Sequence, residues 1–272
     1  MRLRQQPVWR SPEEIAEMAF QRAPVVMMNE AHRGLQRCIR TRQIGQRILP
    51  VAHQAGVRHL AMEALFPMFV EECNKTRQLI NGDFGYLSQP EMKEFIQTAL
   101  NLGWTLVHYE AESFKWITEK HGIDFSSADE QERYRRYREF QPEFTTLEYT
   151  NWREEQQALN IIQALQALPA NTPLLVWCGN SHHSKQGGQE WVPMGYQFKR
   201  HSNINPFVID QTMTVIFDTS EFRANLVEEF SDELVKRGGT AGFLTKEAPP
   251  ELRSNGSDDD DAIVLSTQNE LE

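Results

Sequence analysis

Carboxylates and histidines follow four apolar segments of this sequence, each close to the point where the segment ends. Residues 25–28 are followed by Glu30 and His32, and residues 57–62 are followed by Glu63. The other two segments, 104–109 and 174–178, end in or lead to His108, Tyr109, Glu110, Asn180, His182 and His183. Imidazoles titrate near neutral pH and carboxylates can orient them. These residue types therefore suit general acid–base catalysis or the binding of a divalent metal ion.

The apolar segments alternate with stretches of helical spacing, which is typical of a parallel sheet. Helices are predicted at 11–22, 33–55, 68–80, 88–102 and 146–168. Ser11 and Glu14 form a capping box at the first helix, and Pro50 must kink or divide the second. Two later strands, 206–210 and 213–217, are expected to pair. We therefore predict an α/β fold with a mainly parallel central sheet flanked by helices on both faces.

In such a sheet ligands bind beyond the carboxyl ends of the strands, so the polar residues above are expected to share one rim. Structural alternatives remain open: Glu30 and His32 could be a helix-start acid and a surface histidine, and Glu63 could pair with an arginine of a neighbouring helix. Of the tandem histidines, we expect His182 to point into the site. Packing or surface positions are expected for Cys178, His53, His59, His121 and His201.

Two stretches fall outside the alternating pattern. The segment at about 115–145 holds a charged helix (129–138) that fits either a solvated face or a lid over the site. Beyond residue 218 we expect loops, a solvated acidic turn at 258–261 rather than a calcium loop, and a last edge strand at 262–265. A further turn is predicted at 81–85. The expected organisation is a single domain, 1–272, with a core at about 11–218, the helical lid insertion and a C-terminal extension at 219–272.

The composition argues against several classes of function. Lys and Arg number 28 against 38 Asp and Glu, and the net charge of −10 disfavours nucleic acid and anionic membranes as partners. No apolar run approaches the roughly 20 residues of a membrane-spanning helix, and the basic N-terminus lacks the apolar core of a signal peptide. Three cysteines without a CxxC pair favour a reduced, cytoplasmic protein. The phosphate-binding GxxxxGK[ST] loop, GxGxxG, HExxH and GxSxG are absent.

The order of the motifs resembles the superfamily of erythromycin esterases, Tiki/TraB proteins and ChaN-like haem-binding proteins. Glu30-Ala31-His32 resembles its opening motif, and Glu63 matches the end of its next strand. Residues 152–155 resemble its arginine-bearing helix, and residues 176–182 its late strand ending in Asn-x-His. The resemblance covers about residues 24–184. The sequence departs from it at Asn29, where a glycine is usual, in the shorter spacing from Glu to His, and at Gly179, where the esterases tend to carry a further histidine.

The resemblance implies hydrolysis of an ester, lactone or amide, a chemistry that this set of residues suits. The expected catalytic residues are Glu30, His32, Glu63, Arg153 and His182. His32 is the expected general base, oriented by one of the two glutamates, while Arg153 and His182 face the developing oxyanion. Substrate contacts are expected from Asn180, Glu110, His108, Tyr109 and His183.

Other functions of the same rim remain open. One divalent ion (zinc, manganese or iron) among Glu30, His32, Glu63 and His182 would acidify a bound water. The main alternative is a protein that binds haem or another small ligand, since ChaN-like relatives are associated with haem and Tyr109, His182 or His183 could supply an axial ligand. A third is a signalling or toxin-associated domain whose rim docks a protein partner.

Overall fold

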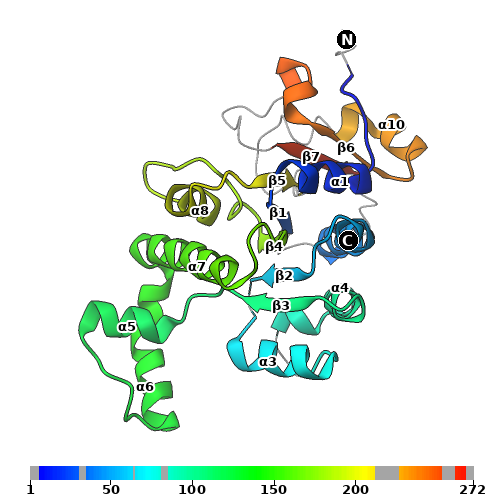
Figure 1. Ribbon diagram of the computed structural model, residues 1–272. Coiled ribbons are helices and arrows are strands. Elements are labelled where there is room, and N and C mark those ends of the chain that lie inside the picture. Colours follow the sequence, from blue (N-terminus) through cyan, green and yellow to red (C-terminus); the bar gives the residue numbers. More distant parts are fainter. Residues whose placement is uncertain are drawn as a thin grey trace.

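The structure is a computed structural model that describes residues 6–30, 35–63, 65–80, 85–211, 227–252 and 261–267 of the 272-residue chain. Its strands are β1 (Val25–Glu30), β2 (His59–Met62), β3 (Thr105–His108), β4 (Leu174–Gly179), β5 (Phe207–Asp210), β6 (Thr240–Leu244) and β7 (Ala262–Ser266). They form one sheet in the order β3-β2-β4-β1-β5-β7-β6 (Figure 1). All neighbours are parallel except β6 and β7. The predicted mainly parallel sheet is confirmed.

Helices cover both faces of this sheet (Figure 1). They are α1 (Pro12–Arg22), α2 (Leu35–Gln54), α3 (Pro67–Thr76), α4 (Pro90–Asn101), α5 (Ser113–His121), α6 (Glu130–Phe140), α7 (Leu147–Ala167), α8 (Met194–Ser202) and α10 (Ser231–Lys236). Apolar residues of α1 to α4 pack on one face, and those of α7 and α8 on the other. Within the described ranges, none of the helices combines the length and the apolar character needed to cross a membrane.

The first βαβ unit follows the local rules of the sequence. Ser11 Oγ accepts a hydrogen bond from the Glu14 amide at 3.2 Å, and the Glu14 carboxylate accepts one from the Ser11 amide at 2.7 Å, as the capping box predicts. β1 is buried at all six positions because helices lie on both of its faces. α2 is one helix with Pro50 inside it, so the alternative that Pro50 divides it is wrong. Pro50 lies on the exposed side, where water can satisfy the freed carbonyl.

The C-terminal region differs from the prediction. β7 is an inner strand between β5 and β6, and the edge strand is β6, which the sequence analysis missed. Gly238 and Gly239, which indicate a loop, turn the chain into β6 with φ of 77° and 88°. At Gly242 a Cβ would lie 2.5 Å from Ile263 O, so glycine there permits close packing rather than a loop. The predicted strand at 213–217 and most of the turn at 81–85 lie outside the described residues.

Asp261 is not part of a solvated turn. Its Oδ2 accepts hydrogen bonds from Lys185 Nζ at 2.6 Å and from the Val208 amide at 3.0 Å. Lys185 is itself buried, so the carboxylate of Asp261 neutralises the buried ammonium group of Lys185 next to β5. The remaining residues of the predicted acidic turn, 258–260, lie outside the described ranges.

The segment from α5 to the start of α7 forms an arm that projects from the body (Figure 1). The arm has its own apolar cluster, which includes Trp116, Ile117, Phe125 and Tyr149. None of the residues of α6 is buried, and Arg135 and Arg136 pair with Glu132 along its surface. Most of α6 is therefore solvated, which is one of the two alternatives that the sequence left open for this segment.

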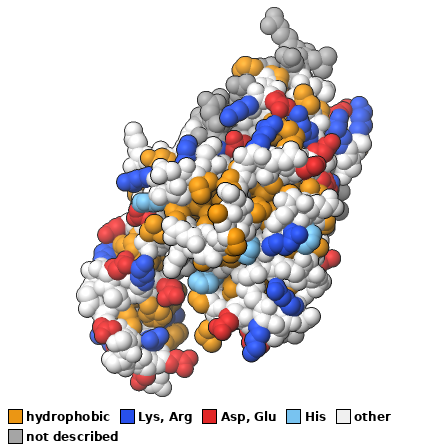
Figure 2. Space-filling model, viewed as in Figure 1, with side chains coloured by type: hydrophobic (Ala, Val, Ile, Leu, Met, Phe, Trp, Pro, Cys, Tyr) orange, Lys and Arg blue, Asp and Glu red, His pale blue; other side chains and the backbone are white. Residues whose placement is uncertain are grey.

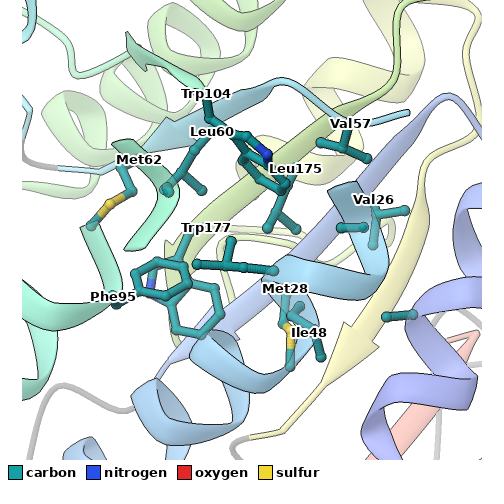
Figure 3. Close-up of a cluster of buried hydrophobic side chains, with 14 of the residues drawn as sticks. Val26, Met28, Ile48, Val57, Leu60, Met62, Phe95, Trp104, Leu175 and Trp177 are labelled. Atoms are coloured by element: carbon teal, nitrogen blue, oxygen red, sulfur yellow. The ribbon is translucent and has the colours of Figure 1, made fainter. Parts of the chain in front are cut away.

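The larger core lies between the sheet and helices α1 to α4 (Figure 3). Trp177 of β4 packs on Phe95 of α4 with ring centroids 4.5 Å apart. Both rings touch the backbone of α2 at Gly45, where a Cβ would lie 2.6 Å from Trp177 Cη2 and 2.9 Å from Phe95 Cε2. Gly45 therefore allows α2 to approach the sheet closely enough to exclude water from this core.

We expect Gly45→Ala to destabilise the protein by about 1–3 kcal/mol, because the new methyl must displace two packed rings. In an exposed helix the same substitution stabilises by about 1 kcal/mol. Urea unfolding measures the difference. Gln43→Ala, on the exposed side of the same helix, should change the free energy of unfolding by less than about 0.5 kcal/mol. A stabilised Gly45→Ala protein would contradict this packing.

Candidate active site

An ion pair joins the end of β2 to α7 at the carboxyl edge of the sheet. Arg153 Nη2 lies 2.8 Å from Glu63 Oε1. Glu63 Oε2 accepts a hydrogen bond at 2.8 Å from the amide of Gly179, the last residue of β4. Glu63 is only 8% exposed. Its carboxylate is therefore fixed by groups from two other elements, and the structural alternative for Glu63, an ion pair with an arginine of a neighbouring helix, is present.

Glu110, which follows β3, holds the same guanidinium from the other side. Its Oε1 and Oε2 lie 2.8 Å from Arg153 Nε and 2.6 Å from Arg153 Nη2, and Gln157 Nε2 donates to Oε1 at 3.0 Å. Burial alone would lower the pKa of Arg153, but the charges and hydrogen bonds of Glu110 and Glu63 raise it. Among the described residues Arg153 Nη1 has no hydrogen-bond or ion-pair partner, so one donor group is left for a ligand.

His182 lies beside this network and is paired with a residue that the sequence analysis did not select. Its Nδ1 is 2.6 Å from Glu154 Oε1, and its Nε2 is 3.9 Å from Glu63 Oε1. Glu154 of α7 is 0% exposed and accepts hydrogen bonds from the Met194 amide at 2.6 Å and from Trp191 Nε1 at 3.2 Å. Glu154 therefore ties the imidazole to α7 and to the start of α8.

The protonation of His182 follows from its neighbours. Burial of the ring favours the neutral form, but the Glu154 carboxylate, 2.6 Å from Nδ1, and the charge of Glu63 outweigh it and raise the pKa of His182. The imidazolium form of His182 therefore persists to higher pH than in an unperturbed histidine. Burial and the same carboxylates, together with Glu30, raise the pKa of Cys178. Cys178 is buried, as predicted, and its thiol is held in the protonated form.

A cavity of about 730 Å³ opens where Arg153 and Glu110 meet the arm. Most of its wall is apolar or aromatic, and its lining residues are Leu65, Phe66, Pro67, Met68, Glu110, Ala111, Glu112, Ser113, Phe114, Tyr137, Tyr149 and Arg153. Hydrophobic side chains are visible on both sides of the gap between arm and body (Figure 2). The volume suits a small molecule with a substantial apolar part.

Glu30 lies at the same edge but on the other face of the sheet from Glu63. Its Oε2 is 3.0 Å from Nε of Arg42 in α2, and both side chains are 1% exposed. Of the expected metal ligands that the structure describes, Glu30 pairs with Arg42 away from Glu63 and His182, and both oxygens of Glu63 are engaged by Arg153 and Gly179. Within the part of the chain that the structure describes, no three metal-ligating side chains are grouped around one point.

The remaining expected site residues lie in different environments. Tyr109 is fully buried and its hydroxyl donates to Trp177 O at 2.9 Å, while His183 is 4% exposed and packs beside Asn29. Neither side chain lines the cavity, because the alternation of β3 and the turn after β4 direct both into the protein. His108 is exposed and alternates with Tyr109, so it lies on the opposite face of the sheet. Asn180 is exposed at the rim with a φ of 28°.

His32, the expected general base, lies outside the described residues, as do its neighbours 31, 33 and 34. The histidines expected to be structural have structural or surface positions. His53 accepts a hydrogen bond from Trp104 Nε1 at 3.0 Å, and burial lowers the pKa of His59. His121 and His201 pair with Glu143 and Glu155 at the surface.

By sequence, the chain matches no protein-family model and no curated protein. By structure, it is similar to a mutant of the erythromycin esterase EreC in its open conformation, with a TM-score of 0.57 and 12% identity over 95% of this chain and 97% of that one. ChaN of Campylobacter jejuni, in a structure concerned with cofacial haem binding, matches with a TM-score of 0.51 and 9% identity over 94% and 92% of the two chains. This protein has the EreA/ChaN-like fold.

A third similar structure with this fold is that of the type III effector HopBA1, at a TM-score of 0.51 and 11% identity over 98% of both chains. Sequence identities this low show the fold alone. The EreA/ChaN-like fold accommodates both an esterase and a haem-binding protein, so the function has to be argued from the site of this chain.

The raised pKa of His182 makes a prediction about stability. A group whose pKa is higher in the folded state stabilises fully below its unfolded pKa, about 6.5, and loses that contribution as the pH rises through its folded pKa. The difference in free energy of unfolding between the wild type and His182→Gln should therefore be largest at pH 5.5–6 and shrink towards pH 9. Denaturant unfolding across this range measures it, and a difference that grows with pH would contradict the Glu154–His182 pairing.

Proposed function

We propose that this protein hydrolyses an ester, lactone or amide bond in a substrate that occupies the cavity beside the arm. The observation that carries the proposal is the pairing of His182 with buried Glu154 next to the Glu63–Arg153–Glu110 network. This arrangement brings the His182 imidazole and the Arg153 guanidinium to the same Glu63 carboxylate, and Arg153 lines the apolar pocket. Two fixed cationic donors are suited to the oxyanion that forms when a carbonyl group is attacked.

In the proposed reaction, water attacks the carbonyl carbon and gives a proton to His32, the expected general base. The negative charge that develops on the carbonyl oxygen is stabilised by His182 Nε2 and Arg153 Nη1. When the tetrahedral intermediate collapses, the carbon–oxygen or carbon–nitrogen bond breaks and His32 returns the proton to the leaving group. Glu63 and Glu110 hold Arg153, and Glu154 holds His182, so these carboxylates orient the donors.

The charge of the site favours a neutral carbonyl over a phosphate ester. Three carboxylates, from Glu63, Glu110 and Glu154, lie within 4 Å of the Arg153 guanidinium or the His182 imidazole. A dianionic phosphate would approach a group whose cations are already paired, whereas a neutral ester acquires its charge only in the transition state. The donors therefore stabilise the reacting species more than the bound substrate.

Binding of haem or another small ligand is the second candidate, supported by the apolar wall of the cavity. Of the three axial ligands expected for it, Tyr109 and His183 are buried and engaged elsewhere, which leaves His182. The ring of His182 would have to leave Glu154 or bind through Nε2. Titration with haemin, followed by a Soret shift that His182→Gln abolishes, would favour this alternative over hydrolysis.

On a substrate found by screening ester, lactone and amide panels, we expect His182→Gln and Glu154→Gln each to lower kcat by about 10²–10³-fold, because each removes or misplaces an oxyanion donor. His201→Gln and Glu155→Gln are matched controls, since His201 of α8 and Glu155 of α7, the residue next to Glu154, form a histidine–glutamate pair 2.9 Å apart at the surface. These controls should retain wild-type turnover. Equal losses in both pairs would contradict the assignment.

We also expect His32→Ala to abolish hydrolysis without loss of the fold, because the proton of the attacking water then has no acceptor. Steady-state turnover and circular dichroism on the same preparation test both parts. Unchanged turnover would show that His32 is not the general base. The proposal would then be limited to the stabilisation of the oxyanion by Arg153 and His182.

A further inference from the structure

A second buried polar cluster lies next to the candidate active site, centred on Asn29 in β1. Asn29 is 0% exposed, although its side chain carries two donors and an acceptor. Its Nδ2 donates to Asn180 O at 2.7 Å and to Asp210 Oδ1 at 2.8 Å, and lies 3.4 Å from His183 Nε2. Its Oδ1 accepts a hydrogen bond from the Gln211 amide at 2.8 Å. One side chain therefore joins β1 to the segments that leave β4 and β5.

The segment after β4 that Asn29 contacts is the turn that carries His182. Asn180 has a φ of 28°, a conformation that costs free energy in a residue other than glycine and persists only where the surroundings enforce it. Its amide donates to Glu30 O at 2.8 Å, and its carbonyl accepts the bond from Asn29. The bond from Asn29 thus acts on the peptide group two residues before His182.

The rest of the turn is closed by backbone bonds and close packing. The His182 amide donates to Gly179 O at 3.1 Å, and the Gly195 amide donates to His182 O at 2.8 Å. A Cβ at Gly195 would lie 2.1 Å from His183 O, so the turn lies directly against the start of α8. Within this closed turn, a shift of the Asn180 carbonyl would be passed on to His182.

We propose that Asn29 is a positioning residue of the active site, because its side-chain amide holds the turn 179–183 in the conformation that directs the His182 imidazole to Glu154. Asn29 touches no substrate. The predicted effect on kcat rests on the proposed hydrolytic function, whereas the predicted effect on the orientation of His182 does not. The positioning role of Asn29 and the hydrolytic function can therefore be disproved independently.

The test compares Asn29→Ser with Asn74→Ser. Asn74 is a matched control because its side chain also forms hydrogen bonds with the backbone. It donates to Leu106 O at 2.9 Å and accepts from the Leu106 amide at 2.8 Å, in β3 and away from His182. The observable is the imidazole Nδ1–H proton of His182 in NMR spectra at one fixed pH, assigned by its absence in His182→Gln. We expect this signal to shift or to be lost through solvent exchange in Asn29→Ser and to stay unchanged in Asn74→Ser.

If the chain hydrolyses the screened substrate, Asn29→Ser should also lower kcat by about tenfold or more with KM changed less than about twofold, because the donor is misplaced while the pocket is intact. An unchanged His182 signal in folded Asn29→Ser overturns the proposal whether or not any substrate is found. Should Asn29→Ser not fold, Asn29→Leu combined with Asp210→Leu replaces both partners of one buried bond by apolar groups and removes the same bond to Asn180. The same two outcomes then apply.

Discussion

The charge of Arg153 is the constraint around which the site is built. A guanidinium that is mostly buried must be neutralised where it lies, because desolvation without a partner would cost several kcal/mol. Glu63 and Glu110 both meet it, so the ends of β2 and β3 are held to α7 by one side chain. His182 lies beside this group, and the carboxylates of Glu154 and Glu63 raise its pKa while the charge of Arg153 lowers it. The electrostatics of the two donors are therefore linked: a substitution at Arg153 would change the protonation of His182 even without touching its ring.

Arg153 and Glu154 are adjacent on α7: Arg153 is one of the two donors, and Glu154 holds the other, His182. They can do so because neighbouring positions on a helix point about 100° apart. Arg153 faces the strand ends and the cavity, while Glu154 faces the turn after β4 and the start of α8. A single turn of one rigid helix thus sets the separation of the guanidinium and the imidazole. The arm that forms the far wall of the cavity is continuous with this helix, so the pocket and the donors share one support.

The sequence predicted strands β1 to β5 and β7 and the part of the site that follows β2, β3 and β4. Glu63, Glu110 and His182 could be found because buried parallel strands are recognised as apolar runs and polar residues at their ends stand out. Glu154 was missed because it lies in a charged stretch of α7, although its spacing from Ala158 and Ile161 puts it on the buried face of the helix. β6 was missed because its glycines indicate a loop, whereas Gly242 serves close packing. The opposite orientations of Glu30 and Glu63 depend on strand register, which no local pattern of the sequence fixes.

The strand order explains how the turn after β4 can hold His182 in one orientation. β4 lies between β2 and β1, so the chain that leaves it has a polar strand end on each side. The Gly179 amide donates to Glu63 after β2, and the Asn180 amide donates to Glu30 O in β1, so consecutive peptide groups are fixed from opposite sides. A turn held in this way can keep a strained residue such as Asn180 and can hold the imidazole two residues later in one orientation. An edge strand such as β3, with a neighbour on one side only, could not constrain a catalytic turn to the same degree.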